Sequence, residues 1–404
     1  MSDSIIVFNA GSSSLKFSLF DATSGGLQFH GEVEDIPGNP GLTVYDATKA
    51  PVYEKAGLSC GHEAALSVVL KWHAEHEDTG DIVAAGHRVV HGGKDFAESV
   101  LVTEAIIEKL EKLIPLAPLH HPHNLKIINV FAALHPAVPQ IACFDTAFHR
   151  TQPRTAELFA LPRRYADEGV LRYGFHGLSY DYIASVLPDY ADDKAQGRVV
   201  VAHLGNGASM CAMTQRKSVA TTMGFTALDG LMMGTRCGAL DPGVVLYLMQ
   251  TQGLTAEEVT RLLYKDSGLK GVSGVSHDMR DLLASGAPAA KEAIDLFCYQ
   301  AARQLAGLIP ALGGLDVLVF TAGIGAGSSE IRKNICKRLS WLGLVLDDEA
   351  NVAQEHTIHS PQSAVDLYVI ATNEERTIAD MTMTMVAAVG GQNKNAEDQR
   401  SAAS

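Results

Sequence analysis

The sequence has 404 residues, of which 47% are hydrophobic and 19% are charged, a composition that is typical of a folded globular protein and excludes disorder throughout. Lysine and arginine number 32 against 46 for aspartate and glutamate, so the net charge is -14. This charge repels a nucleic-acid backbone and offers no counterion release, so we expect no nucleic-acid partner. Predominantly apolar stretches such as 199–202 and 315–320 are far shorter than the roughly 20 residues that cross a bilayer, so no membrane span is expected.

Chain length, the first residues and the spacing of the cysteines indicate the number of domains, the location and the state of the thiols. One core rarely serves more than roughly 250 to 300 residues, so the length predicts two domains with a cleft between them. The start of the chain, Met1–Ser4, lacks the basic and apolar stretches of a signal peptide, which predicts a cytoplasmic location. The six cysteines are scattered, with no two within four positions, and are interpreted as buried thiols, not as disulfides or metal ligands.

The first half of the sequence alternates short apolar strands with amphipathic helices, which predicts a mixed α/β sheet. Residues 5–8 and 15–20 are expected to form two strands joined by the small polar turn 10–14. The other elements expected here are a helix over 63–75, a strand over 82–87, a helix that begins at Thr103 and a strand over 140–144. Pro115, Pro118 and Pro122 are expected to break any helix after Leu113 and to shape a rigid loop.

The second half begins like the first, with a strand over 199–204, a glycine turn over 205–209 and a strand over 210–213. This layout fits an internal duplication, although strand–turn–strand units are common enough to arise by coincidence. The tail from Gly390 has no periodicity and is expected to fray. The later elements expected are helices over 241–251, 255–263 and 288–312, a strand over 315–320, a capped helix after Ser328, a strand over 365–371 and a last helix from about Glu374.

The first turn has the composition of an anion-binding loop. It gathers Asn9, Ser12, Ser14 and Lys16 around Gly11. Backbone N–H groups and hydroxyls in a tight turn can hold a phosphate, and the lysine adds a positive charge at the rim. Taken alone, an ordinary solvated hairpin is the simpler interpretation.

Two further glycine turns, 205–209 and 323–328, also follow predicted strands. The turn at 323–328 opens a helix, whose N-terminus favours negative charge. Three such turns together favour nucleotide binding. The sequence has no Gly-x4-Gly-Lys-Ser/Thr motif, no dinucleotide fingerprint and no protein-kinase signature, so the commoner phosphate-binding folds are disfavoured.

Residues 7–16, Val-Phe-Asn-Ala-Gly-Ser-Ser-Ser-Leu-Lys, and 141–149, Ile-Ala-Cys-Phe-Asp-Thr-Ala-Phe-His, closely resemble the two signature motifs of the acetate kinase family, which includes propionate kinases. The resemblance covers nearly the whole chain in order, continuing through 86–93, 117–120, 172–177, 203–209, 230–238, 276–280 and 372–375. It implies the α/β fold class of two duplicated ribonuclease H-like (actin-like ATPase) domains around a central cleft, usually as a homodimer.

The resemblance also implies domain bounds and an activity. Residues 1–147 plus 377–404 would form the N-terminal domain, to which the last helix returns, and 148–376 would form the C-terminal domain with the nucleotide site. The implied reaction is reversible phosphoryl transfer between ATP and acetate, giving acetyl phosphate and ADP, with Mg²⁺ or Mn²⁺ as cofactor.

Site residues follow from the resemblance by matched position. Arg88 and Arg236 would clamp the carboxylate and the γ-phosphoryl group, His176 would stabilise the transition state, and Asp145 would orient or neutralise groups beside a metal held by Asn9 and Glu374. The acyl pocket would be formed by Arg88, Val90, Leu119, Phe175 and Ala227, and His120 would line the site. The ATP-binding residues would be Ser12, Ser14, Lys16, His203, Asn206, Gly207, Asp278, Arg280, Gly323 and Gly325.

These residue types suit the chemistry. A carboxylic acid with a pKa near roughly 4 is ionised at neutral pH, so its oxygen can attack phosphorus without a general base. Bringing one anion against another calls for arginine forks and a divalent cation. His176 is therefore assigned an electrostatic role, and His149 is interpreted as a positioning residue. In-line transfer is the simplest mechanism, while a phosphoenzyme, for example on Glu374, stays open.

The sequence departs from the family pattern at several positions. Ala227 stands where proline is usual, which could admit propionate, because one methylene changes binding by only about 1 to 3 kcal/mol. Ala326 and Gly327 replace Glu-Asn in the adenosine loop, which leaves nucleotide preference open, and His121 and His123 replace smaller or amide residues. A short-chain acyl kinase such as a propionate kinase is thus one alternative. An actin- or Hsp70-like ATPase without an acyl acceptor is another, disfavoured by the two arginines.

Overall fold

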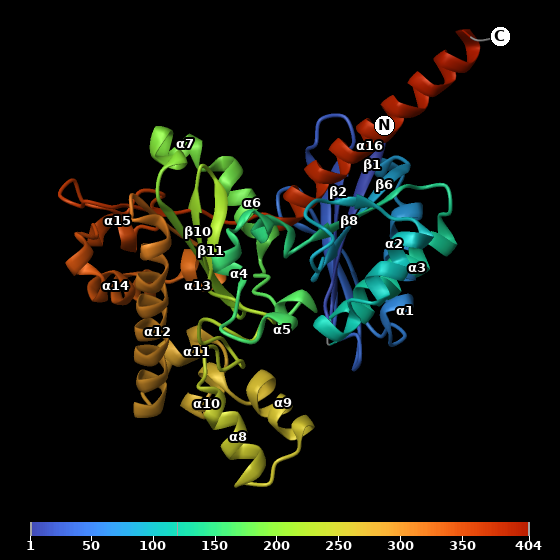
Figure 1. Cartoon of the computed structure of the whole chain (residues 1–404). Coiled ribbons are helices and arrows are strands. Elements are labelled where there is room, and N and C mark those ends of the chain that lie inside the picture. The colour runs from blue at the N-terminus through green and yellow to red at the C-terminus, as the bar shows by residue number, and fades with distance from the viewer. Residues whose placement is uncertain (1, 119, 403–404) are drawn as a thin grey trace. The chain divides into compact units, whose positions relative to one another are not determined.

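The computed structural model describes residues 2–118 and 120–402, with side chains described except at Glu77 and beyond residue 388 (Figure 1). The chain divides into two compact units, each with its own sheet: unit 1 is Met1–Ala147 with Asn373–Ser404, and unit 2 is Phe148–Thr372. The short 3-10 helices are η1 (Glu77–Thr79), η2 (Ile114–Leu116), η3 (Ala147–Thr151), η4 (Asp192–Gln196) and η5 (Ser340–Leu342). No helix in the described part of the chain is long and apolar enough to span a membrane.

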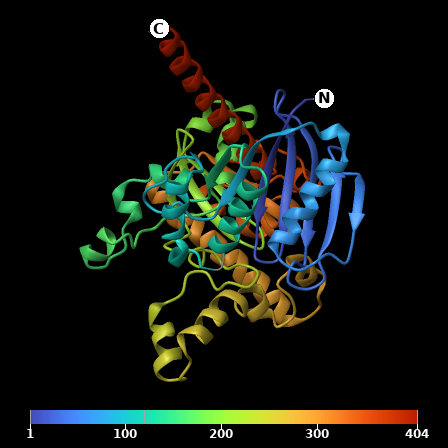
Figure 2. The same ribbon diagram turned by 90° about the vertical axis from the view of Figure 1, so that its right-hand side faces the viewer.

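Unit 1 contains an eight-stranded sheet in the order β5-β4-β3-β2-β1-β6-β8-β7, and its blue strands lie side by side in both views (Figures 1 and 2). The predicted hairpin is confirmed as β1 (Ser4–Ala10) antiparallel to β2 (Leu15–Asp21). The next strands, β6 (Ile82–Val89) and β8 (Gln140–Phe144), extend the sheet in parallel from β1. Four strands were not expected from the sequence: β3 (Leu27–Glu34), β4 (Gly41–Asp46), β5 (Pro51–Lys55) and β7 (Val100–Leu101). Hydrophobic residues alternate only weakly in these segments, and they form strands because they pair with neighbouring strands of the sheet.

Helices cover both faces of this sheet. The helices α1 (His62–Glu75) and α3 (His121–Leu134) pack on the face that carries Phe8. On the other face, a Cβ at Gly86 would collide with Ile378 and Thr382 of α16 (Glu374–Ala402). The remaining helix, α2 (Glu104–Glu111), is capped by Thr103 as predicted.

Two expectations for unit 1 are wrong. Pro122 does not prevent a helix, because it lies in the first turn of α3, where its missing N–H leaves no hydrogen bond unmade. The backbone of the tail from Gly390 is helical to Ala402, since extending an existing helix avoids the cost of a new nucleus.

Unit 2 repeats the strand pattern of unit 1. Its sheet has the order β11-β10-β9-β12-β13, with β9 antiparallel to β10, β10 antiparallel to β11, and β9, β12 and β13 mutually parallel in that order. The strands β3-β2-β1-β6-β8 have the same order and directions. This shared pattern supports an internal duplication. The bounds are β9 (Val199–Leu204), β10 (Ala208–Thr214), β11 (Lys217–Thr221), β12 (Val317–Thr321) and β13 (Asp366–Val369).

The helix α6 (Gly177–Val186) covers one face of this sheet with Tyr180 and Ile183, while α12 (Pro288–Leu312) runs along the other (Figure 1). The predicted cap of Ser328 is confirmed, because its hydroxyl accepts from the Ile331 N–H. The other helices of unit 2 are α4 (Arg154–Glu157), α5 (Arg163–Asp167), α7 (Pro188–Ala191), α8 (Pro242–Gln250), α9 (Ala256–Lys265), α10 (Gly268–Ser273), α11 (Met279–Ala284), α13 (Ala322–Gly327), α14 (Ser329–Arg338) and α15 (Asp348–Val352).

Two further expectations need correction. The third glycine turn is the short helix α13 and not an irregular loop, because its small residues let the chain pack closely on β9, where Gly325 lies against the carbonyl of Ala202. The cysteines are free thiols, of which four are buried, but Cys60 is exposed and Cys237 is half-buried.

Candidate active site

Arg88 is the centre of a polar cluster in unit 1. Its Nε and Nη2 atoms donate to the carboxylate of Asp145 at 3.0 and 2.6 Å, and its Nη1 donates to Asn9 Oδ1 at 3.1 Å. Glu374 Oε2 lies 3.9 Å from the same Nη1. These groups come from β1, β6, the end of β8 and the start of α16. They meet because the carboxyl ends of neighbouring parallel strands share one edge of a sheet.

Charge is finely balanced in this cluster. Burial opposes the positive charge of Arg88, but the carboxylates of Asp145 and Glu374 together raise its pKa above the usual value. Burial also raises the pKa of Glu374 to about 7, with Arg88 opposing and Asp145 adding to the rise. Glu374 is therefore a carboxyl group that would gain from a further positive charge beside it.

The first glycine turn adjoins this cluster. The Gly11 N–H closes the turn on the Ser14 carbonyl at 2.9 Å, and Ser12 is exposed. Lys16 lies opposite Asn9 in the hairpin, but its ammonium is 3.5 Å from the carboxylate of Glu32. The turn therefore exposes backbone groups and serine hydroxyls to solvent, while the Lys16 ammonium is paired with Glu32 on β3.

The predicted acyl-pocket residues are divided between the units. Val90 follows β6, and its N–H donates to Asn124 Oδ1 at 3.2 Å, while His120 precedes α3. Leu119 lies outside the described residues. Phe175 is buried in unit 2.

His176 is held rigidly at the start of α6 in unit 2. Its backbone is left-handed, with φ 59° and ψ 25°. The ring Nδ1 is 2.8 Å from Ser209 Oγ, and the ring stacks on His203 with centroids 4.2 Å apart. His203 is in turn fixed by Ser179 Oγ at 2.8 Å from its Nδ1. These bonds leave the Nε2 edge of His176 facing the second glycine turn, at Gly207.

Arg236 lies at the same turn. A Cβ added at Gly207 would be 2.7 Å from Arg236 Nη2 and 3.2 Å from His176 Nε2, so the missing side chain gives both side chains room. Asn206 packs its amide against Gly234. Arg236 Nη1 donates to the carbonyl of Ala227 at 2.6 Å. Among the described residues Arg236 has no carboxylate partner, and burial lowers its pKa, which suits a site that awaits an anion.

The predicted adenosine residues lie elsewhere in unit 2. Asp278 caps α11 and pairs with Arg280, whose Nη2 is 2.6 Å from its carboxylate. The bond from Arg280 lowers the pKa of Asp278 to about 2. Gly323 lies in α13, where an added Cβ would meet open space. The face of α13 is therefore bare backbone at this position.

Three positioning residues escaped the sequence analysis. Asn124 Nδ2 donates to the Ala10 carbonyl at 3.0 Å, and His62 Nε2 lies 2.6 Å from the Gly11 carbonyl. The fully buried Arg332 donates to the carbonyls of Gly325 and Ala326 at 3.0 and 2.7 Å. Arg332 lies next to the core residue Ile331 in α14, and this position could have suggested that it is buried. The bonds of Asn124 and His62 join segments that are distant in the sequence, so no local pattern indicated them.

The buried His149 fits the positioning role expected for it. Its Nε2 donates to the carbonyl of Phe175 at 3.0 Å, and its Nδ1 therefore accepts from Ser218 Oγ at 2.9 Å. Phe175 directly precedes His176 in the chain. His149 thus fixes the backbone that carries the catalytic candidate.

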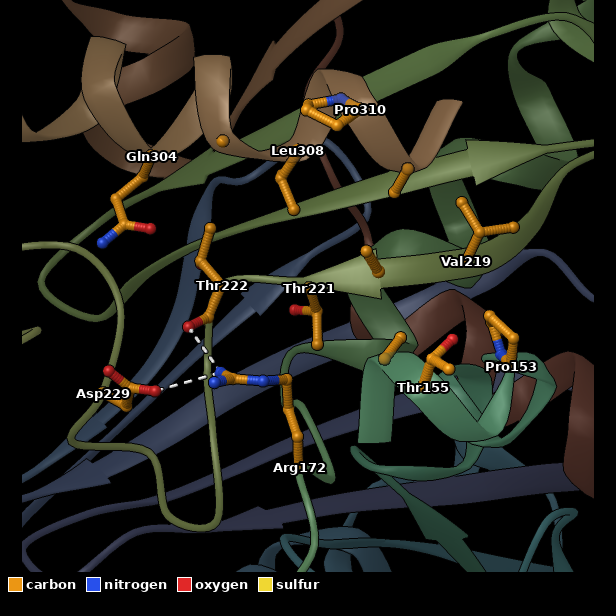
Figure 3. A pocket seen from close by; sticks show the side chains of 14 residues that line it. Pro153, Thr155, Arg172, Val219, Thr221, Thr222, Asp229, Gln304, Leu308 and Pro310 are labelled. Carbon is orange, nitrogen blue, oxygen red and sulfur yellow. Dashed lines mark hydrogen bonds and ion pairs between the residues drawn. The ribbon is translucent and has the colours of Figure 1, made fainter. Parts of the chain in front are cut away.

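A separate cavity of about 740 Å³ lies in unit 2 between α4, β11 and α12 (Figure 3). Arg172 reaches into it and pairs with Asp229 at 3.0 Å. None of the predicted phosphate or acyl residues lines this cavity. It is therefore distinct from the clusters described above.

Comparisons with known proteins point to one family. The model of the acetokinase family matches residues 4–380. The acetate kinase of Rhodopseudomonas palustris is 52% identical over 389 residues, covering 94% of this chain and 97% of that protein. The acetate kinase of Methylocella silvestris is 49% identical over 401 residues, covering 96% and 98%.

Two solved structures share the fold over almost the whole chain. A propionate kinase from Francisella tularensis has a TM-score of 0.89 at 37% identity, and the acetate kinase of Porphyromonas gingivalis has a TM-score of 0.87 at 36% identity. Each match covers 95% of this chain and 100% of the other. With the family model, the close relatives and the two duplicated α/β units in agreement, the chain belongs to the acetokinase family.

Proposed function

We propose that this chain catalyses the reversible transfer of the γ-phosphoryl group of ATP to acetate, giving acetyl phosphate and ADP. The observation that carries the proposal is the buried Arg88 guanidinium, which Asp145 and Asn9 hold beside a glycine turn. A second guanidinium, Arg236, lies beside His176 at another glycine turn. Two such cations fit a reaction that brings a carboxylate against a phosphoryl group.

In this mechanism the acetate oxygen attacks phosphorus directly. Acetate is already ionised at neutral pH, so no side chain has to remove a proton. Arg88 binds the acetate carboxylate, and its fork is kept in one orientation by the bonds to Asp145. The chain's contribution is therefore positioning and charge neutralisation.

The residues at the second glycine turn bind the phosphates. Arg236 and the Nε2 edge of His176 would donate to the equatorial oxygens of the transferred group as its charge shifts. His203, Asn206 and Gly207 would lie along the remaining phosphates. Losing one such donor typically costs about 2.7 to 4 kcal/mol of transition-state stabilisation.

The residues of the Arg88 cluster fit a magnesium ion. Asn9, Asp145 and Glu374 offer the oxygen donors that Mg²⁺ prefers. Burial raises the pKa of Glu374, so a cation beside it would favour the ionised carboxylate. No group of three His, Cys, Asp or Glu side chains in the described part of the chain could hold a metal by itself, which agrees with an ion shared with substrate phosphates. When bound, Mg²⁺ (or Mn²⁺) would neutralise phosphate charge.

Unit 2 carries the adenosine contacts in this proposal. Asp278 and Arg280 would meet the ribose end, and the bare backbone of α13 at Gly323 would face the base, while Gly325 packs against β9 behind it. Ala326 and Gly327 supply little or no side chain for recognition of the base, so other purine nucleoside triphosphates should compete with ATP. An ATP-consuming reaction also supports the cytoplasmic location predicted from the sequence.

Trapping with hydroxylamine tests the proposal. Purified protein with ATP, Mg²⁺ and acetate should form acetohydroxamate, and the product should vanish without acetate. ATP hydrolysis at the same rate with and without carboxylates, and no hydroxamate, would contradict the proposal and favour an ATPase without an acyl acceptor.

A preference for propionate is the alternative that one observation favours. Position 227 carries only a methyl group, and its carbonyl is tied to Arg236 Nη1 at 2.6 Å, so the pocket lacks bulk there while its backbone is fixed. Comparing kcat/KM for acetate, propionate and butyrate separates the two. A higher value for propionate would replace acetate as the proposed substrate.

We also propose that the chain acts as a homodimer through α8. This helix has no buried residue, and its apolar side chains Leu246 and Tyr247 are 54% and 52% exposed. Val244 and Met249 add to the same exposed helix. Large exposed apolar patches mark sites of association, and a second copy of this chain is the occupant we propose.

A further inference from the structure

Three carbonyl groups of the first glycine turn, those of Ala10, Gly11 and Ser13, are each bonded by a different segment of unit 1. Asn124 of α3 donates to the Ala10 carbonyl at 3.0 Å, and the Ile36 N–H donates to the Ser13 carbonyl at 3.0 Å. Between them, the Gly11 carbonyl lies 2.6 Å from Nε2 of His62, the first residue of α1. A carbonyl can only accept, so His62 carries its proton on Nε2 and donates it.

This bond fixes the direction of the next N–H group. The Gly11 carbonyl and the Ser12 N–H belong to one planar trans peptide, in which the two groups point in opposite directions. With the carbonyl turned toward His62, the Ser12 N–H points away from the packed body of unit 1. Because Ser12 is exposed, this N–H is available to an anion at the turn.

The side-chain environment of Gly11 does little to fix the Gly11–Ser12 peptide. Glycine has no Cβ to restrict its backbone, and an ideal Cβ at Gly11 would come no closer than 3.6 Å to another atom. Backbone sterics therefore do not hold this peptide. The hydrogen bond from His62 is the restraint that the structure provides on it.

The ring of His62 is itself held in place. It stacks on His123 of α3, with ring centroids 4.5 Å apart and an angle of 25° between the planes. His123 is one of the positions at which this chain departs from the family pattern. The stacked pair therefore links the starts of α1 and α3 to the turn between β1 and β2.

We propose that His62 is a positioning residue for phosphoryl transfer, which locks the Gly11–Ser12 peptide so that the Ser12 N–H faces the transferred phosphoryl group. This inference rests on the proposed function. His62 touches no substrate and acts only through the backbone of the turn. Its loss should therefore lower kcat without weakening the binding of acetate or of the nucleotide.

The test compares His62→Leu and His62→Gln in the full-length protein. Leucine removes the donor but keeps bulk, while glutamine can place an amide N–H near the position of the imidazole Nε2. We expect His62→Leu to lower kcat about tenfold in both directions, which is less than the roughly hundredfold loss on removing a transition-state donor, because the Ser12 N–H is displaced and not removed. KM for acetate and the Kd for ADP from calorimetry should stay within twofold, and His62→Gln should recover most of the activity.

His76→Leu is the matched control. His76 lies at the other end of α1, bonds the Trp72 carbonyl through its ring at 2.7 Å and stacks on the Trp72 ring. It thus makes the same kinds of contact about 20 Å along the helix from His62. If His62→Leu and His76→Leu lower the melting temperature equally, that decrease measures the structural contribution of such a histidine and not a role in catalysis.

The outcomes separate the inference from the proposed function. Equal kcat for His62→Leu and His76→Leu would overturn the inference while the wild type still forms acetohydroxamate. A wild type without acetate-dependent product would instead overturn the proposed function. Hydrogen exchange of a peptide covering residues 9–15 should accelerate in His62→Leu and not in His76→Leu, and an unchanged rate would also count against the lock.

Discussion

Single side chains connect segments of this protein that lie far apart in its sequence. Arg88 bonds Asn9, 79 positions away, and Asp145, 57 positions away. His62 bonds Gly11, 51 positions away. The resemblance to the acetate kinase family could assign roles to Asn9, Arg88 and Asp145, but neither it nor the local pattern indicated that one guanidinium joins them.

Replacing Arg88 by lysine tests the forked bond. Lysine keeps the charge but cannot bond both Asp145 oxygens and Asn9 at once. We expect kcat/KM for acetate in Arg88→Lys to fall on the order of a hundredfold or more. Arg150→Lys, which alters another shielded arginine–carboxylate pair at 2.7 Å from Glu157, should leave kcat/KM within twofold in steady-state assays. Comparable losses in both variants would contradict the specific role of Arg88.

His149 gives a prediction for pH. Burial lowers its pKa from 6.5 to about 4 in the folded state, so the unfolded chain binds a proton there at a pH where the folded chain does not. The stability from this group is present above pH 6.5 and is lost as the pH falls toward 4, by about 3 kcal/mol in total.

His149→Gln keeps a donor for the Phe175 carbonyl but cannot titrate. Between pH 7 and pH 5 its melting temperature should therefore decline less than that of the wild type. His87 and His121, two other buried histidines whose pKa burial lowers, titrate in both proteins and cancel in the comparison. An equal decline in the melting temperature of the two proteins between pH 7 and pH 5 would refute the prediction.

At the scale of elements, segments with a clear apolar pattern were predicted well, and segments without one were predicted poorly. The strand β8 and the helix α12 have the predicted bounds, because β8 is a nearly unbroken apolar run and α12 has a long amphipathic pattern. The short helix α13 was expected as a loop, since glycine is a poor helix former in isolation. Its helical form depends on Arg332, which donates to the carbonyls at its end.

Arg332→Met should therefore disturb α13. It leaves the carbonyls of Gly325 and Ala326 without their buried donor, which we expect to cost about 3 kcal/mol of stability and to raise KM for ATP several-fold with KM for acetate unchanged. Lys333→Met, which alters an exposed pair with Asp348 at 2.9 Å, is the matched control. Denaturant unfolding and substrate titrations check both parts, and equal effects on the two KM values would disprove the link to the nucleotide.

At the scale of the whole molecule, both units use one strand pattern. In each sheet the first two strands along the chain form an antiparallel hairpin whose turn is rich in glycine and small polar residues, and two later strands extend the sheet in parallel from the first. The similarity of the two hairpins in the sequence was short and could have been coincidence. The matching order of five strands in both sheets supports duplication much more strongly.

The prediction at the scale of the whole molecule is that two copies of the chain form a dimer through α8. We expect the wild type to be a dimer by light scattering after gel filtration. Leu246→Glu places a charge on α8 and should yield monomers with unchanged secondary structure by circular dichroism. Val52→Glu, at an apolar residue of unit 1 that is 46% exposed, should remain dimeric. A monomeric wild type, or a dimer unaffected by Leu246→Glu, would count against α8 as the interface.

The sequence by itself determined the family, the two hairpins and the chemical character of the site, because these follow from contiguous motifs and from hydrophobic periodicity. Only the tertiary structure decided that Asn124 and His62 hold the first turn, that Arg332 supports α13 and that α8 stays exposed. Such contacts depend on which strands and helices become neighbours in a sheet, and the local spacing of residues carries no record of that order.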